Sequence, residues 1–236
     1  MIKTLFQYWD TINIDPRLTP NIKSMENIVS SESYVLYNRD TASEYIRDNM
    51  SPEVCEYFEN FHDTLPAARS DMFRIVRCLV DGGSYWDTSH RIIHSNLKKI
   101  KQLFIAPEYD ITLVCKINAR GKFRISNSPL ISTPRNIHIS TIWRNVCVNI
   151  EKRKHNNVWS CTGPGVIQHY ISSLIGYPSD TDWKQNLLFY IDKLKVDHSI
   201  NLVCREDIIK YIKIYPITRG GTHWSKQQKK LGTIYR

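Results

Sequence analysis

Two neighbouring stretches of the sequence give the clearest signals of secondary structure: Ala67-Ala68-Arg69-Ser70-Asp71-Met72-Phe73-Arg74 and Asp81-Gly82-Gly83-Ser84-Tyr85-Trp86-Asp87-Thr88-Ser89. The first predicts a helix over 67–80, because apolar residues recur there at helical spacing and Pro66 stands at its start. Two glycines predict its end. The residues 84–86 that follow directly are typical of a strand, which would bring Asp87 to the edge of a sheet.

The rest of the chain repeats this alternation of strands and helices. We predict further strands over 4–8, 34–37, 111–117, 122–125 and 130–132, and further helices over 41–49, 139–150, 166–175 and 183–190, the first of these helices capped by Asp40 or Thr41. This pattern predicts an α/β fold with one mixed, mostly parallel sheet flanked by helices. Because no repeat and no linker divides the chain, we expect a single domain over 1–236, with a basic tail over 226–236 that we interpret as a mobile flap.

The composition fits an ordinary globular protein. The chain has 236 residues, of which 42% are hydrophobic and 23% charged, with 9 Gly and 10 Pro, so disordered and fibrous classes are excluded. Lysine and arginine number 32 against 23 acidic residues, which gives a net charge of +9. That excess indicates an anionic partner, and by itself leaves nucleic acid, an acidic membrane surface and a phosphate-bearing small ligand open.

The sequence predicts a cytoplasmic protein. Its first ten residues lack the apolar run of about 7 to 15 residues that a signal peptide needs. The longest uncharged stretch, 155–179, is interrupted by glycine, proline and asparagine, so we expect no membrane span. The 6 cysteines show no CxxC or zinc spacing, and we interpret them as reduced thiols.

Several common catalytic motifs are absent. The sequence contains no GxGxxG, GxxxxGK[ST], HExxH or GxSxG, and the 8 histidines are dispersed. Dinucleotide, P-loop, zincin and α/β-hydrolase functions therefore have no support from motifs.

The opening block resembles a known signature. It is similar to the A-x-x-S-D-x-x-R followed by G-G-x-Y-x-D-x-D of glycosyltransferases with the DxD-containing sugar-binding region. This family includes yeast-type initiating α-mannosyltransferases and many capsular-polysaccharide enzymes, and large clostridial glucosylating toxins share its core. Asp71 and Arg74 stand three residues apart, and Asp87 follows Asp71 at the family spacing of sixteen.

Four further segments resemble the family in the same order along the chain. Ile2 to Trp9 is similar to its opening strand, with Lys3, Gln7 and Trp9 matching and Phe6 in place of a histidine. The other three resemble its N-x-x-I-x-x-x-P, T-G-P-G-V and closing H-x-W segments, and they are Asn127 to Pro134, Thr162 to Val166 and Thr222 to Ser225. The resemblance thus runs from residue 2 to about 225 and implies a GT-A-like fold.

The resemblance also implies roles for individual residues. Asp87 would hold Mn²⁺ or Mg²⁺, which neutralises the diphosphate leaving group of a UDP- or GDP-sugar. Asp71 and Arg74 would contact the ribose and the transferred sugar, and Trp9 would stack on the base. The remaining donor-binding residues are expected to be Gln7, Asn127, Thr162, Gly163, Trp224 and Ser225, and the remaining metal contacts Ser89 and His223.

One departure from the family pattern affects the metal. Ser89 stands where the second carboxylate of D-x-D is usual, and a hydroxyl is a weaker ligand without charge. The metal would then be held more weakly, or water, His90 or His223 would take over the role.

We therefore expect a hexosyltransferase that acts on a glycan or protein acceptor, assisted by a metal. The resemblance implies retention of anomeric configuration, along a front-face path through an oxocarbenium-like state. Two alternatives stay open: a nucleotide-sugar-binding module that has lost turnover through Ser89, and a basic nucleic-acid-binding protein. The latter would bind with steep salt dependence and is the less favoured partner class.

Overall fold

A computed structural model describes residues 4–29, 31–93, 100, 108–118, 121–176, 183–215 and 224–236. The strands are β1 (Leu5–Tyr8), β2 (Tyr34–Tyr37), β3 (Gly83–Tyr85), β4 (His90–Ile92), β5 (Ile111–Ile117), β6 (Phe123–Ser132), β7 (Ile200–Cys204) and β8 (Ile212–Ile214). The helices are α1 (Thr19–Glu26), α2 (Arg39–Asn49), α3 (Pro52–Glu59), α4 (Pro66–Asp81), α6 (Ile137–Glu151), α7 (Val158–Cys161), α8 (Pro164–Ile175), α9 (Trp183–His198), α10 (Arg205–Ile208) and α11 (Trp224–Leu231).

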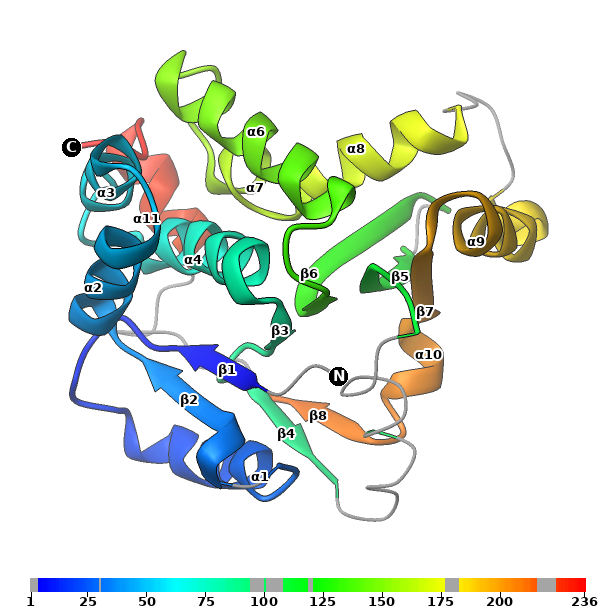
Figure 1. Cartoon of the computed structure of the whole chain (residues 1–236), viewed down its shortest axis with the longest axis horizontal. Coiled ribbons are helices and arrows are strands. Elements are labelled where there is room, and N and C mark those ends of the chain that lie inside the picture. Colours follow the sequence, from blue (N-terminus) through cyan, green and yellow to red (C-terminus); the bar gives the residue numbers. More distant parts are fainter. Residues whose placement is uncertain are drawn as a thin grey trace.

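The centre of the molecule is a six-stranded sheet in the order β2-β1-β3-β6-β5-β7 (Figure 1). The pairs β1–β2, β1–β3 and β5–β7 are parallel, whereas β6 is antiparallel to both β3 and β5. Five strands therefore share one direction and β6 opposes them, which confirms the predicted mixed, mostly parallel sheet. A separate pair, β4 with β8, lies beside it.

Layers of apolar side chains cover both faces of this sheet. Phe6 and Leu130 belong to the larger core, which α4, α6 and α8 complete, and the neighbouring residues Leu5 and Ile131 belong to the smaller one. Successive strand residues point to opposite faces, so this alternation shows that the sheet is buried on both sides. Figure 1 shows α4, α6 and α8 on one side and α1 with β4 and β8 on the other.

Helix α4 and strand β3 follow the local rules that predicted them. Pro66 occupies the first turn of α4, where its missing N–H is not needed. Gly82 ends the helix with φ +69°, and a Cβ atom there would lie 2.7 Å from the carbonyl oxygen of Ser132. Only glycine satisfies both the backbone angle and the lack of space. The chain therefore enters β3 at once and delivers Asp87 to the sheet edge.

An irregularity in β6 shapes the same edge. Leu113 of β5 pairs with Leu130, but the next residue, Val114, pairs with Ser126. The three residues 127–129 therefore leave the ladder as a bulge. A bulge redirects side chains locally without changing the flanking pairs, and here it turns Asn127 and Ser128 toward α4 and Asp87.

The sequence predictions differ from the structure at a few elements. The two strands predicted over 122–125 and 130–132 are one strand, β6, because the bulge joins them. Helix α2 begins earlier than predicted and its cap is Asn38, whose side chain accepts from the N–H of Thr41 while Thr41 caps in return. The elements α3, β4, β7 and β8 were not predicted, since each is short.

The chain end is anchored. Within 226–236, α11 continues to Leu231, and Ile234 and Tyr235 are buried in the larger core. Tyr235 also forms a β-bridge with Phe61 and stacks on its ring. The prediction of a mobile flap from the basic composition was therefore wrong. Burial of Ile234 and Tyr235 holds the segment against the core although it carries several lysines.

Within the ranges given above, no helix combines the length and apolar character needed to cross a bilayer.

Candidate active site

Asp71 and Arg74 form a buried ion pair on α4. Their side chains are 9% and 4% exposed, and Arg74 Nη2 lies 2.9 Å from Asp71 Oδ1. Arg74 also donates to the carbonyl oxygen of Asn127 at 2.9 Å and to Ser70 Oγ at 3.0 Å. Its guanidinium carbon lies 4.1 Å from the centre of the Tyr85 ring. A buried charge with this many partners is held in one geometry.

Asp87 joins this network from the end of β3. Arg74 Nη2 lies 3.1 Å from Asp87 Oδ1, and the Tyr85 hydroxyl donates to the same oxygen at 3.0 Å. Burial opposes ionisation, but the Arg74 guanidinium, His90 and these hydrogen bonds outweigh it and hold the pKa of Asp87 below its usual range. The side chain is 38% exposed, so an ionised carboxylate is accessible at the sheet edge.

The pKa of Asp71 is shifted in the opposite direction to that of Asp87. Burial raises the pKa of Asp71 to about 6, although Arg74 attracts its charge and Asn127 Nδ2 donates to Oδ1 at 2.8 Å. Neighbouring Asp87 adds to the rise. Two carboxylates that share one arginine thus have pKa values displaced in opposite directions, a pattern common at functional sites.

The segment Thr162-Gly163 packs against the carboxylate of Asp71. A Cβ atom on Gly163 would lie 2.9 Å from Asp71 Oδ2, so a glycine is required for the chain to approach the carboxylate. Thr162 is fully buried, and its hydroxyl has no hydrogen-bond partner within the described part of the chain.

Gln7 and Trp9, the two donor-binding residues predicted from the opening strand, differ in exposure. Gln7 is fully buried: its amide donates to the carbonyl oxygen of Asp87 at 3.2 Å and accepts from the Tyr34 hydroxyl at 2.7 Å. It therefore supports the backbone of Asp87. Trp9 is partly exposed just beyond β1, and its indole N–H donates to the carbonyl oxygen of Asn13 at 3.3 Å.

The predicted metal contacts are only partly assembled. Ser89 is partly exposed two residues after Asp87, and its carbonyl oxygen accepts from the N–H of Tyr215. His90 is buried, and burial lowers its pKa. Among the described residues, no three histidine, cysteine, aspartate or glutamate side chains lie close enough together to hold a metal. Among the predicted metal contacts that the structure describes, the donors are the accessible carboxylate of Asp87 and the hydroxyl of Ser89.

Only the last two residues of the closing segment 222–225 are described. His223 lies outside the described residues, as does Lys3, and Trp224 and Ser225 begin α11. That helix docks on α7, where Gln228 Oε1 accepts from the N–H of Val158 at 2.8 Å.

Sequence reasoning missed three supporting residues. The hydroxyl oxygens of Ser70 and Tyr85 lie 2.9 Å apart, where Ser70 accepts from Arg74 and Tyr85 donates to Asp87. Ser128 Oγ accepts from the N–H of Asp87 at 2.8 Å. Ser70 and Tyr85 stand inside the motif, which could have identified them. Ser128 gives no such signal, because its position depends on the bulge in β6.

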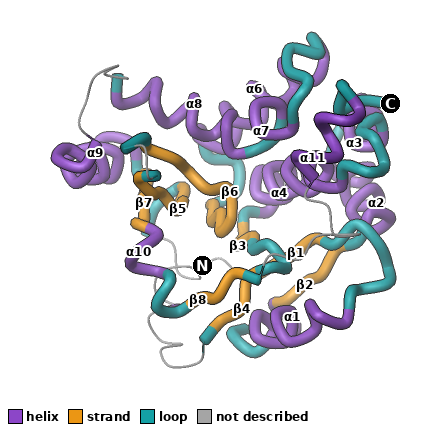
Figure 2. The backbone as a smooth tube through the Cα atoms, turned by 180° about the vertical axis from the view of Figure 1, so that it is seen from behind, coloured by secondary structure: helices purple, strands orange, loops and turns teal. Residues whose placement is uncertain are grey.

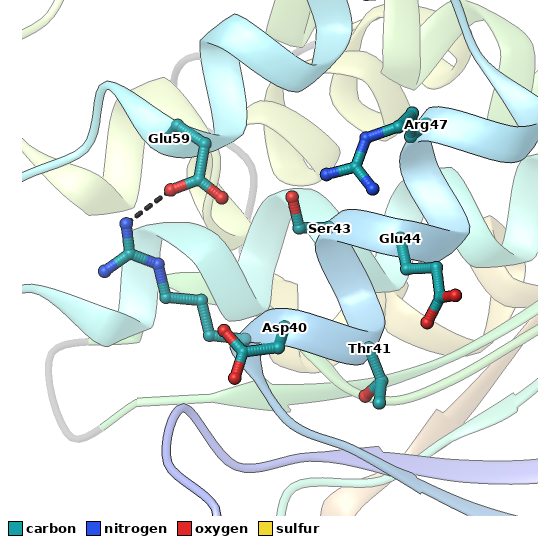
Figure 3. Close-up of a pocket in the computed structure, with 7 residues that line it drawn as sticks. Asp40, Thr41, Ser43, Glu44, Arg47 and Glu59 are labelled. Carbon is teal, nitrogen blue, oxygen red and sulfur yellow. Dashed lines mark hydrogen bonds and ion pairs between the residues drawn. The ribbon is translucent and has the colours of Figure 1, made fainter.

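Two surface pockets of about 490 Å³ each lie beside α2 and α3, apart from this network, and Figure 3 shows the first of them. The first is lined by Arg39, Asp40, Thr41, Ser43, Glu44, Arg47 and Glu59, with Arg39 paired to Glu59. None of the predicted site residues lines either pocket, and both carry mixed charges.

Known structures define the class of fold. The chain is similar to "PaToxG Glycosyltransferase" with 14% identity and a TM-score of 0.54, over 84% of this chain and 79% of that one. It also matches a glycosyltransferase involved in the glycosylation of the major capsid of PBCV-1, with 8% identity and a TM-score of 0.41, over 98% of this chain and 99% of that one. No protein-family model and no curated protein matches the sequence. The fold is that of a GT-A-like glycosyltransferase.

Proposed function

We propose that this protein is a glycosyltransferase that moves a hexose from a UDP- or GDP-sugar to a glycan or protein acceptor. The observation that carries the proposal is the network of Asp71, Arg74 and Asp87, built where β3 ends in a glycosyltransferase fold. In open α/β sheets, ligands bind at the carboxyl ends of parallel strands. This network stands at such an end.

The donor would lie across that edge. Trp9, at the end of β1, offers a partly exposed indole for the base. Arg74 and Asp71 are buried beneath, where they would orient the ribose and the transferred sugar through hydrogen bonds. Asn127 holds both and would keep them fixed during the reaction.

We further propose that Asp87 binds Mn²⁺ or Mg²⁺ together with the donor diphosphate. Its accessible, ionised carboxylate suits a hard cation, and these ions commonly keep few protein ligands and take substrate phosphates. The bound ion would neutralise charge on the leaving diphosphate. With Ser89 in place of a second carboxylate, we expect weak metal binding.

Retention of configuration is part of the proposal. Retention without a covalent intermediate needs the acceptor to approach the same face of the sugar that the diphosphate leaves. The acceptor hydroxyl then gives its proton to the departing phosphate oxygen as the new glycosidic bond forms and the old one breaks.

The test is a screen of purified protein against UDP- and GDP-sugars, with and without Mn²⁺, by thermal shift and by sugar release. We expect metal-dependent stabilisation and release of sugar from one donor. Stabilisation without release, with acceptors present, would favour the binding module that has lost turnover. No response to any donor, together with steep salt-dependent binding to DNA or RNA, would refute the proposal.

A further inference from the structure

Trp159 is an exposed tryptophan next to the proposed active site. Its exposed fraction is 39%, whereas Trp86 and Trp143 are 0% and 9% exposed. Tryptophan combines a large apolar ring with a polar N–H, so a partly exposed indole can contact a ligand.

The chain makes specific room for this indole. A Cβ atom on Gly165 would lie 2.5 Å from Trp159 Cε3 and 2.7 Å from Cζ3. Gly165 is helical and needs no left-handed backbone, so the lack of space beside the indole and the carbonyl oxygen of Trp159, which would also lie 2.5 Å from that Cβ atom, is what requires a glycine here. One side of the ring thus packs against the backbone of α8.

Helix α7, which carries Trp159, is fixed from three sides. Asn157 caps it by accepting from the N–H of Ser160, and Asn149 of α6 donates to the carbonyl oxygens of Ser160 and Cys161. Gln228 of α11 accepts from its first N–H. The backbone that presents the indole is therefore held in place before any ligand arrives.

The backbone of Trp159 lies close to the proposed catalytic network. A Cβ atom on Gly163 would lie 2.9 Å from Asp71 Oδ2 and 3.0 Å from Trp159 Cα, so both residues lie beside Gly163. The guanidinium carbon of Arg124, on β6, lies 5.9 Å from the Trp159 ring centre. Further along the same strand, Ser128 contacts Asp87.

We infer that Trp159 and Arg124 form the acceptor subsite and that the acceptor is a glycan. An exposed indole attracts the C–H face of a pyranose ring, because the ring face of tryptophan carries negative potential. Arg124 supplies hydrogen-bond donors for the sugar hydroxyls beside it. The inference rests on the proposed function, which leaves glycan and protein acceptors open, and it selects the glycan.

The first test measures binding without turnover. Protein labelled with 5-fluorotryptophan gives ¹⁹F resonances, and the one missing from Trp159→Phe belongs to Trp159. We expect methyl glycosides and neutral trisaccharides to shift this resonance, and an unglycosylated random peptide to leave it in place. A resonance that responds to the peptide alone, or to none of these probes, would overturn the inference.

The second test uses the donor identified by the screen. In Trp159→Ala, we expect the ratio of transfer to donor hydrolysis to fall about tenfold, mainly through the KM of the glycan, as truncation of a buried aromatic anchor does in interfaces. Trp159→Phe should recover much of the ratio. Phe189→Ala, which alters a 64% exposed aromatic on α9, is the matched control and should not change it.

The two failures are distinguishable. Absence of donor turnover in the wild type contradicts the proposed function, whereas normal turnover with an unchanged ratio in Trp159→Ala contradicts the acceptor subsite.

Discussion

Two arginines of α4, Arg69 and Arg74, are both buried, but their surroundings differ. Arg74 uses Nε, Nη1 and Nη2 in hydrogen bonds or ion pairs. Arg69 is 0% exposed, yet its Nε and Nη1 make no hydrogen bond within the described part of the chain, and Asp10 is 3.8 Å from Nη1. Burial lowers the pKa of Arg69, whereas Tyr85, Asp87 and Asp71 outweigh burial around Arg74 and raise its pKa.

Their partners explain the difference. Arg69 Nη2 donates to the carbonyl oxygen of Phe61 at 2.5 Å and to Asp63 at 3.2 Å, and Asp63 also pairs with Arg39 and Arg236. This cluster joins the first turns of α4 to Arg236, and Figure 2 shows the C-terminus beside α3. We conclude that the Arg69 cluster connects α4 to the preceding loop and to Arg236, whereas the Arg74 network is arranged around an accessible carboxylate.

The largest expected effect is on donor turnover, and it should differ between Asp87 and Asp63. Asp87→Asn should lower donor turnover by about 10³-fold, since it removes the charge proposed to hold the cation. Asp63→Asn, the matched change in the other cluster, should leave turnover within about twofold. Steady-state kinetics of sugar release would check both, and equal losses in the two variants would remove the distinction.

The two arginines should differ in stability. Arg74→Met should lower the free energy of unfolding by about 4 kcal/mol, because it leaves two carboxylates without their buried partner. Arg69→Met should cost about 1 kcal/mol or less, because Asp63 is 60% exposed and keeps other partners. Urea denaturation would measure both values, and the reverse order would contradict our comparison.

Asp71 should make stability depend on pH. Its folded pKa of about 6 lies above its unfolded value, so its contribution is present below about pH 4 and lost as pH rises through 6. Relative to Asp71→Asn, the wild type should lose on the order of 3 kcal/mol between pH 4 and pH 7. A constant difference between the two proteins across this range would contradict the raised pKa.

The smallest effect concerns the metal. Ser89→Asp should tighten Mn²⁺ binding in the presence of donor by about tenfold, because it restores a second carboxylate next to Asp87. Isothermal titration would measure the change, with Ser89→Asn as the uncharged control. Equal affinities in the two variants would mean that another group completes the site.

Much of the fold follows from local sequence signals. The strands over 34–37 and 111–117 lie where the sequence predicted them, and α4 with Gly82-Gly83 and β3 deviates by one or two residues. These elements have long periodic patterns or clear end signals. β7 was missed because a five-residue apolar run carries little information until β5 pairs with it.

The site could be predicted in part. The sequence named Asp71, Arg74, Asp87, Asn127 and Gly163, and the structure brings these five together. It could not show that Arg69 and Arg74 differ, since both stand on one helix and only their partners from other parts of the chain distinguish them. Nor could it show that Gln7 faces inward, because a glutamine in a buried strand depends on tertiary partners.

The bulge in β6 separates the residues that contact the candidate site from the regular strand pairs around them. The ladder between β5 and β6 stops before residues 127–129 and resumes after them, so the length of this excursion is independent of the register on either side. A change of length there would leave the pairs on either side in place but would move Asn127 and Ser128, which contact Asp71, Arg74 and Asp87. The conformation of this one segment therefore sets the geometry of the network while the sheet stays the same.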